Sequence, residues 1–425
     1  MKFHFLSEEA SSLFLAWRLK HDGHAVTFYH LDDPTRKARV GDGMVKLSPT
    51  PEPPKGAIVI FDSTGKGRMG TDLRRRGWKV IGGNPFDEDL ELDRASGTKI
   101  MQALGIATPK TKVMGSISQG QAYVSTHPGV WYFKPNGKTT TLTNHGEGKM
   151  FVRWLEWASQ FIEGEPFELQ AAVEGIEIST EGWFDGQRFV PPFNSTLEEK
   201  HFLTGDHGPR TGCESNVVWC WEGNEPQLPK GTVLRLTALL KKAGYVGPVD
   251  LNAIIDGTGK PHGLEWSARL GFDASQAYSL LVDGDYGEQL AAFAEGKLDR
   301  WDLKPGYAMT LRVTVPPYPS ESVVEAKKTA GLPIDPAIVA DPRRYLPSDV
   351  RIERGGPVVA GAHGYVVAVG TTGSTFSACR KTLLRMADDL DLEQKQYRVD
   401  PVHRAEKAWA ALEAHGLVEL QKAAA

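Results

Sequence analysis

The segment Asp250–Gln276, DLNAIIDGTGKPHGLEWSARLGFDASQ, carries polar residues at positions where two core strands are expected. Two β-rich runs flank the turn DGTG at 256–259, and this arrangement predicts a β-hairpin. A loop centred between residues 257 and 258 sets Asp250 opposite Glu265. Because side chains alternate between the two faces of a strand, one face of the hairpin collects the polar side chains of Asp250, Asn252, Glu265 and Ser267, with Arg269 in line behind them. Oxygen ligands that converge from two strands suit Mg²⁺ with bound phosphates, so the hairpin favours a nucleotide-using enzyme.

Composition limits the classes of protein that remain. The 425 residues exceed one hydrophobic core and predict about two to four domains. A net charge of -4 argues against a nucleic-acid partner, which would favour a strongly basic domain, and three cysteines suit a reducing compartment. The acidic start MKFHFLSEEASS does not form a signal peptide, and no apolar run is long enough for a membrane span. We therefore expect a soluble, cytoplasmic protein without a membrane partner.

The order of patterns along the chain predicts several domains. Residues 1–92 alternate between apolar strands and amphipathic helices, which indicates a small doubly wound α/β domain. Residues 193–216 read as a long polar loop, and long loops in compact regions are commonly functional. After Trp301 the chain becomes rich in β patterns, and an amphipathic helix is predicted over 374–390. We place the boundaries at 1–92, 93–305 and 306–403, with a closing helix and tail over 404–425.

A lysine at the end of the aromatic strand WYFK is a candidate for binding phosphate. Lys134 precedes the loop PNGKTTTLTNHGEG, where a flexible segment can close over a nucleotide. The loop does not form a Walker A motif, because Tyr132 stands where that motif requires glycine. Taken alone, Lys134 is better explained as a surface lysine whose stem covers apolar residues.

The order of these features resembles the ATP-grasp superfamily. A lysine on a helix, a lysine on a strand, a glutamate after a glycine turn and the polar hairpin follow one another as in those enzymes. Within the superfamily, the chain is similar to the phosphoribosylamine–glycine ligases. The resemblance lies in LEEKHFLTGDHGPRTG (197–212), GLEWSARLG (263–271), VEGIEISTEGWFDG (173–186), GYVVAVGTTGSTFSACRK (364–381) and YRVDPVHR (397–404). It implies a multidomain α/β and α+β chain: an N-terminal doubly wound domain, an ATP-grasp domain with a lid over about residues 110–180, and a β-rich C-terminal domain.

The same resemblance implies roles for individual residues. ATP, with Mg²⁺ or Mn²⁺, is the implied cofactor pair, and small carboxylate and amine molecules are the implied partners of a monomer. The residues implied to bind ATP are Lys99, Lys134, Lys138, Gln170, Ala172, Val173 and Glu177. The implied metal ligands are Glu265, Ser267, Asn252 and Asp250, the implied catalytic residues are Arg269 and Lys200, and the implied substrate residues are Pro209, Thr211, Gly212 and Lys66.

Departures from the family pattern lie mainly on the amine side. Ser267 stands where the family has an asparagine metal ligand, and Gln170 stands where it has a hinge glutamate. The glycine-rich turn that accepts ribose phosphate is replaced by SEEASS at 7–12, and glutamates repel phosphate. The leading hypothesis is thus a C–N bond-forming ligase of a purine-biosynthesis type, which joins glycine or a similar carboxylate to an altered amine. The alternatives are the authentic phosphoribosylamine–glycine ligase and a nucleotide-binding homologue without turnover.

Overall fold

The computed structural model describes residues 1–135, 144–162, 166–223, 226–320 and 323–418. Of the predicted site residues, Lys138 lies outside these ranges, as does most of the loop after the strand that ends in Lys134. Three larger sheets and a small hairpin organise the described chain. Among the described residues, no helix has the length and apolar character needed to cross a bilayer.

The N-terminal sheet is parallel and has five strands, as the strand–helix alternation predicts. Its strand order is β3-β2-β1-β4-β5, with β1 at Lys2–Ser7, β2 at Ala25–His30, β3 at Lys46–Leu47, β4 at Ile58–Phe61 and β5 at Lys79–Ile81. The helices between them are α1 (Leu13–His21), α2 (Asp33–Ala38) and α3 (Gly67–Arg75). All four residues of β4 are buried, which is typical of a continuous apolar run inside a parallel sheet. The turns after β1 and β4 lie at the carboxyl edge of this sheet.

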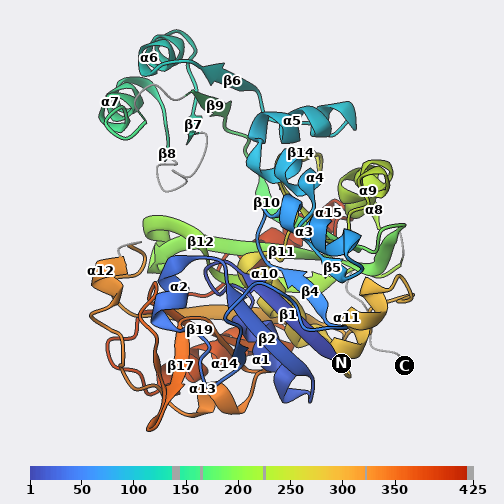
Figure 1. The fold of residues 1–425 in the computed structure, drawn as a ribbon. Coiled ribbons are helices and arrows are strands. Elements are labelled where there is room, and N and C mark those ends of the chain that lie inside the picture. Colours follow the sequence, from blue (N-terminus) through green and yellow to red (C-terminus); the bar gives the residue numbers. More distant parts are fainter. Residues whose placement is uncertain (136–143, 163–165, 224–225, 321–322, 419–425) are drawn as a thin grey trace.

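An eight-stranded antiparallel sheet forms the centre of the molecule (Figure 1). Its order is β14-β13-β10-β11-β12-β15-β19-β16, with β10 at Ile176–Phe184, β11 at Phe189–Leu203, β12 at His207–Cys220, β13 at Gly247–Ile255, β14 at Pro261–Ser267, β15 at Tyr307–Thr314, β16 at Tyr345–Pro347 and β19 at Tyr365–Gly373. The sheet runs across the predicted boundary at 305/306, so β15 and β19 extend the strands that carry the candidate site. The domain limits stay a prediction.

The expectation of a long polar loop over 193–216 is wrong. These residues lie in β11 and β12, which pair antiparallel around the short helix η3 (Thr204–Asp206). Polar residues occur in both strands because one face of the sheet carries the candidate site instead of packing into an apolar core. Glu199 and Ser215 are paired across the two strands and both are buried. A polar pattern therefore concealed two long strands.

The predicted hairpin is present, but its register differs from the prediction. Strands β13 and β14 pair Asp250 with Ser267 and Asn252 with Glu265, so the expected pair of Asp250 and Glu265 is wrong. The turn is centred on Thr258, and a bulge after Asn252 adds one residue to β14. Both changes together move the register by two residues. Because a two-residue shift preserves the facing of side chains, the polar face survives the error.

The segment predicted as the lid, which keeps that name below, is a four-stranded sheet with its own apolar core. It has the order β6-β9-β7-β8, with β6 at Thr111–Met114, β7 at Trp131–Pro135, β8 at Asn144–Gly146, β9 at Phe167–Ala171, and the helices α6 (Ile117–Thr126) and α7 (Gly148–Ala158). Phe133, Leu155 and Phe167 are fully buried in its core. The lid stands apart from the central sheet and joins it through α5 (Arg94–Ala103) and residues 172–175 (Figure 1).

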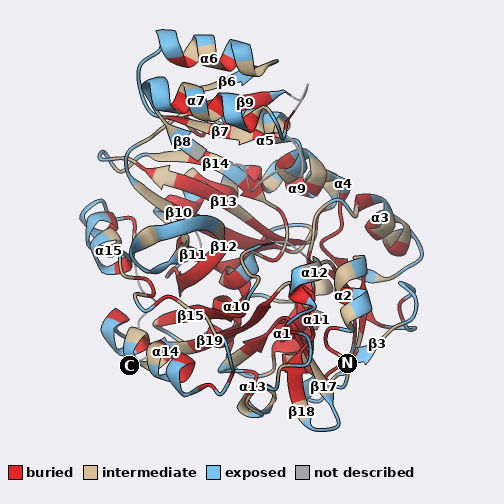
Figure 2. Ribbon diagram, turned by 90° about the vertical axis from the view of Figure 1, so that its left-hand side faces the viewer, coloured by how far each residue is buried: buried red, intermediate tan, exposed pale blue. Residues whose placement is uncertain are grey.

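The remaining elements cover the central sheet and its edges. They are α4 (Pro85–Asp87), η1 (Glu88–Leu92), α8 (Gln227–Gly231), η4 (Val233–Leu236), α9 (Thr237–Ala243), α10 (Phe272–Leu281), α11 (Tyr286–Ala294), α12 (Val323–Ala326), α13 (Ala337–Ala340), β17 (Val350–Glu353), β18 (Gly356–Val359), α14 (Phe376–Asp389) and α15 (Ala405–Ala414). The predicted C-terminal helices correspond to α14 and α15. Figure 2 shows buried residues concentrated in the strands of the central sheet and exposed residues on the outer helices.

Candidate active site

The candidate site begins as a polar face on neighbouring strands of the central sheet. Strand β10 contributes Ser179 and Glu181, which pair with Asn252 and Asp250 of β13. Ser179, Glu181 and Asn252 are buried. Burial raises the pKa of Glu181 to about 7, although its carboxylate accepts hydrogen bonds from Asn194 (2.9 Å) and Trp183 (3.2 Å). The alternation of strand side chains thus places carboxyl, amide and hydroxyl groups together on one face.

Two oxygens on this face lack hydrogen-bond partners. Oδ1 of Asp250 and Oδ1 of Asn252 are both buried and unpaired among the described residues. The amide nitrogen of Asn252 is occupied, since it donates to Glu177 Oε1 (3.3 Å) and Ser179 Oγ (3.4 Å). Burial raises the pKa of Asp250 well above its ordinary value, and Glu181 adds to the effect. Unpaired buried oxygens are costly, and this pair suits a cation or a donor group that completes the site.

Lys200 is held at the same face by two carboxylates. Its Nζ lies 2.6 Å from Glu177 and 3.4 Å from Glu198. Burial opposes the charge on Lys200, but the attraction of Glu177 and Glu198 outweighs it and raises the lysine pKa. Lys200 in turn lowers the pKa of Glu177 to about 2 despite burial, with help from Arg210 at 3.6 Å. The structure therefore brings together two predicted residues, Lys200 and Glu177, as a charged pair.

The lid brings a second lysine to this face. Burial lowers the pKa of Lys134 on β7, while Glu265, Glu168 and Glu177 favour its charge. The pKa of Glu265 is lowered, because Lys134, Arg94 and Lys200 outweigh the desolvation of its carboxylate. Residues from both the lid and the central sheet therefore surround Lys134 and Glu265, although these two residues lie far apart in the chain.

Arg94 was not recognised from the sequence, and it lies closer to the site than Lys99. The guanidinium of Arg94 is 3.4 Å from Glu265, whereas Lys99 on the same helix is exposed. The one available signal was position: Asp93 accepts a hydrogen bond from the backbone of Ser96 and caps α5, so its neighbour Arg94 is held at the start of the helix. The role of Lys99 stays a prediction.

The hinge residues lie at the end of the lid sheet. Gln170 is buried on β9, and its amide donates to Thr111 Oγ1 at 3.4 Å. The backbone N–H of Ala172 donates to the carbonyl of Val130 at 2.9 Å. Val173 follows as partly buried chain that leads into β10. The structure thus places these three predicted residues on the connection between lid and central sheet.

Arg269 follows the end of β14, where Glu91 and the two polar-face carboxylates Glu265 and Asp250 all favour its charge and raise its pKa despite burial. Its Nε is 2.8 Å from Glu91, and its guanidinium lies over the ring of Phe272 at 4.7 Å. Glu91 also accepts from the backbone N–H of Ala268 at 3.0 Å, so it positions both the strand end and the arginine. Glu91 was missed by sequence reasoning, because it sits in an acidic run without a distinguishing pattern.

A cavity of about 180 Å³ opens beside Arg269. Its lining comes from the turns after β1 and β4 and from the start of α10: Glu8, Glu9, Ser11, Asp62, Ser63, Thr64, Arg269, Leu270 and Phe272. Lys66, a predicted substrate residue, pairs with Glu8 at 3.2 Å and so borders this cavity. Arg269 therefore separates the polar sheet face from a hollow at the N-terminal sheet.

The predicted substrate residues Pro209, Thr211 and Gly212 lie on the first part of β12. The hydroxyl of Thr211 contacts Glu214 at 2.7 Å. Tyr318 donates to the same carboxylate at 2.7 Å. These residues stand on the hairpin that carries Lys200, but the structure does not join them to the pair of Lys134 and Glu265.

Comparison with known proteins can now be set beside this geometry. No protein-family model matches the chain. The phosphoribosylamine–glycine ligase of Ralstonia nicotianae is 23% identical over 349 residues, which cover 78% of this chain and 80% of that protein. The protein of the same name from Chlorobaculum tepidum is 25% identical over 352 residues, which cover 77% and 79%.

Solved structures extend the similarity to the fold. The phosphoribosylamine–glycine ligase of Thermotoga maritima superimposes with a TM-score of 0.71 at 19% identity and covers 95% of this chain and 100% of its own. A biotin carboxylase from Campylobacter jejuni, solved as a complex with an ATP analogue, gives a TM-score of 0.59 at 14% identity and 92% coverage of each chain. This chain has the ATP-grasp fold and is similar in sequence to the phosphoribosylamine–glycine ligases. The predicted superfamily, fold class and family resemblance are confirmed.

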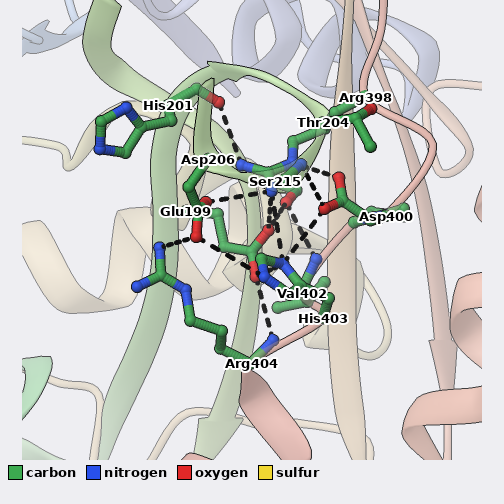
Figure 3. Close-up of polar contacts among 12 residues, drawn as sticks. Glu199, His201, Thr204, Asp206, Ser215, Arg398, Asp400, Val402, His403 and Arg404 are labelled. Atoms are coloured by element: carbon green, nitrogen blue, oxygen red, sulfur yellow. Dashed lines mark hydrogen bonds and ion pairs between the residues drawn. The ribbon is translucent and has the colours of Figure 1, made fainter. Parts of the chain in front are cut away.

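One further feature of this ATP-grasp protein fixes the hairpin that carries Lys200. Figure 3 shows Arg398 between three carboxylates, Glu199 (3.0 Å), Asp206 (3.2 Å) and Asp400 (2.9 Å). His403 lies 2.7 Å from Glu199, and Arg404 lies 2.6 Å from Asp206. Glu199, Asp206 and His403 form a group that could hold a metal ion among the described residues. The two arginines already neutralise those carboxylates, so we interpret the group as an ionic clamp between β11, η3 and the C-terminal segment.

Proposed function

We propose that this chain is an ATP-dependent ligase that joins a small carboxylate, glycine or a close analogue, to an amine. In the reaction, a carboxylate oxygen of the substrate takes the γ-phosphoryl group of ATP to give an acyl phosphate and ADP. The amine nitrogen then attacks the carbonyl carbon, phosphate leaves with the electrons of the broken C–O bond, and the nitrogen releases a proton. The names of the relatives support this class of reaction, and the fold supports ATP as the phosphoryl donor.

The observation that carries the proposal is the convergence of charge on the central sheet. Lys134 from the lid and Lys200 from β11 both favour the charged form of Glu265 and so lower its pKa. Cations held at one face by neighbouring carboxylates are suited to neutralising the charge of a transferring phosphoryl group. Because Glu177 holds Lys200 in place, the lysine is oriented before any substrate binds. The residues on this face thereby supply positioning and charge neutralisation, and no covalent nucleophile is needed.

The same face fits a divalent cation. Mg²⁺ prefers oxygen ligands, and Glu265 and Asn252 lie directly opposite each other with Asp250 and Ser267 as the next pair. The Oδ1 atoms of Asp250 and Asn252, which have no hydrogen-bond partner among the described residues, would coordinate such an ion. We propose Glu265, Asn252 and Asp250 as metal-binding residues, with Ser267 as a weaker donor. When bound, the ion would supply positive charge to the phosphate oxygens of ATP.

The test separates phosphoryl transfer from amine use. Purified full-length protein is incubated with Mg²⁺, ATP, labelled ADP and glycine, and label exchange from ADP into ATP is measured. Exchange that depends on glycine or a close analogue is the expected result, since acyl phosphate formation is reversible and needs no amine. Absence of both exchange and calorimetric ATP binding would overturn the proposal and favour a homologue without turnover.

The authentic phosphoribosylamine–glycine ligase reaction is the second candidate. The names of the relatives favour it, because each of the two quoted sequences carries that name. Phosphate release with glycine and phosphoribosylamine, measured beside other amines, tests it. Turnover with phosphoribosylamine at the highest kcat/KM of the set would replace the altered-amine proposal with this one.

A further inference from the structure

The cavity beside Arg269 has one group of anion-binding donors, and that group is already occupied. The carboxylate of Asp62, at the end of β4, accepts from the backbone N–H groups of Glu8 (2.9 Å) and Ser12 (3.0 Å). It also accepts from the hydroxyls of Ser12 (2.6 Å) and Ser7. These donors stand at the start of α1, where backbone N–H groups commonly bind phosphate. An internal carboxylate therefore takes the place that a substrate phosphate would use.

The turn after β1 keeps an unusual backbone conformation without glycine. Glu9 and Ala10 both have a φ of 56°, in the left-handed region that is strained for a non-glycine residue. Three contacts hold the turn in this shape: the bonds of Asp62 described above, the bond from Glu9 N–H to Asp32 (2.9 Å), and the burial of Ala10. The conformation directs two consecutive glutamates to the cavity, and such strain is typical of functional turns.

The charges that line the cavity are mainly negative. Glu8, Glu9 and Asp62 contribute carboxylates, of which Glu8 pairs with Lys66 at 3.2 Å, and the one arginine in the lining, Arg269, pairs with Glu91 at 2.8 Å. Ser63 adds a buried hydroxyl whose Oγ has no hydrogen-bond partner among the described residues. A volume of about 180 Å³ exceeds by far the space that one water molecule needs, which is about 10–15 Å³, so a small organic molecule has room.

We propose that this cavity binds the amine substrate, and that this substrate is a primary amine without a phosphate group. The ammonium form is attracted by Glu8 and Glu9, the hydroxyl of Ser63 offers it a hydrogen bond, and the ring of Phe272 covers its apolar part. A phosphate is disfavoured by the same carboxylates and finds its usual donors bound to Asp62. That the bound amine is a substrate rests on the proposed ligase function. The preference for an amine without phosphate depends only on the residues that line the cavity.

Matched ligand pairs test the preference directly. Binding of ethanolamine and phosphoethanolamine, and of glucosamine and glucosamine 6-phosphate, is measured by calorimetry on the full-length protein. Each pair has the same primary amine and differs by one phosphate. We expect the unphosphorylated member of at least one pair to bind about tenfold or more tightly than its partner. In the variant E8Q/E9Q this preference should fall to about threefold or less, whereas E52Q, an exposed carboxylate of the same domain outside the cavity lining, should retain it.

Two binding results with the wild-type protein, and one with the variant, would overturn the inference. One is equal or tighter binding of the phosphorylated members, and the other is no measurable binding of any unphosphorylated amine. Preservation of the preference in E8Q/E9Q would also reject the assignment to this cavity. The exchange assay with glycine needs no amine, so its failure removes the ligase proposal without deciding the binding preference. A preserved circular dichroism spectrum for E8Q/E9Q is expected, because both side chains lie at the surface of a turn.

Discussion

The central sheet and the N-terminal turn satisfy their buried charges in opposite ways. On the sheet, Asp250 and Asn252 each keep one buried oxygen that has no hydrogen-bond partner within the described part of the chain. At the turn, Asp62 is also buried but accepts hydrogen bonds from three residues. The difference indicates that the sheet face is completed by a ligand, whereas the anion site at the turn is completed by the protein itself. Under the proposed function, the phosphate chemistry belongs to the sheet, and the cavity beside the turn is left for a molecule without phosphate.

The largest expected effect comes from a substitution on the polar face of the central sheet. Glu265→Gln removes a charge that faces Lys134, Lys200 and Arg94, and turnover should fall by about 100- to 1,000-fold. Phosphate release under saturating ATP and glycine measures the loss. The exposed Glu393→Gln is the matched control and should keep full activity with the same melting temperature. Unchanged turnover in Glu265→Gln would show that the sheet face is not the site.

Asp62→Asn tests the turn after β1 through the pH dependence of stability. Burial raises the pKa of Asp62 from 3.8 to about 6, so the folded state holds a proton more tightly than the unfolded chain does. The stability from this group is therefore present below pH 3.8 and lost as the pH rises through about 6. The difference in unfolding free energy between wild type and Asp62→Asn should change by about 3 kcal/mol at most over that window. Urea unfolding at several pH values measures it.

A control for that experiment is Asp32→Asn, which accepts from the same turn but is only partly buried. If the difference in unfolding free energy between wild type and Asp62→Asn did not change with pH over this range, the carboxylate of Asp62 would not be buried in the way described.

Lys134→Met tests whether the lid contributes a phosphate ligand to the open face. The KM for ATP should rise about tenfold or more, since a cation beside Glu265 is lost. Lys112→Met is the matched control, because Lys112 is exposed on another strand of the same lid sheet. Initial rates over a range of ATP concentrations give both values. Equal KM values for the two variants would remove Lys134 from the site.

Glu177→Gln should alter stability on the acid side, in the opposite sense to Asp62. Lys200 lowers the pKa of Glu177 from 4.5 to about 2, so its contribution is present above pH 4.5 and lost as the pH falls toward 2. Because the side chain is 38% exposed, solvent screening limits the loss to about 1 kcal/mol near neutral pH. The difference in unfolding free energy between wild type and variant should be smaller at pH 3 than at pH 7. A difference that is the same at both pH values would exclude the ion pair as the cause.

Ser267→Asn has the smallest expected effect. Asparagine offers a carbonyl oxygen opposite Asp250, where the hydroxyl of serine is a weaker donor to Mg²⁺. Turnover at limiting Mg²⁺ should rise by about two- to fivefold, with little change at saturating Mg²⁺. Reduced activity under both conditions would indicate that Ser267 serves packing and not the metal.

Periodicity predicted the elements whose patterns are local. The parallel N-terminal strands, the hairpin of β13 and β14, and the helix α14 follow from apolar runs and alternation that neighbouring residues display. The strands β11 and β12 were read as a loop, because their polar residues face a site instead of a core. The hairpin register was misplaced by two residues, since a bulge cannot be seen in a pattern of period two.

The chain order alone was sufficient to predict that polar residues share one face of the hairpin, because side-chain alternation is a local property of a strand. The docking of distant elements settled which charges meet: Arg94 lies beside Glu265, and Glu91 pairs with Arg269. It also settled that Asp62 fills the turn after β1, 50 residues away from Ser12. Such pairs depend on the packing of separate sheets and helices, and electrostatic partners over that distance leave no periodic trace in a sequence.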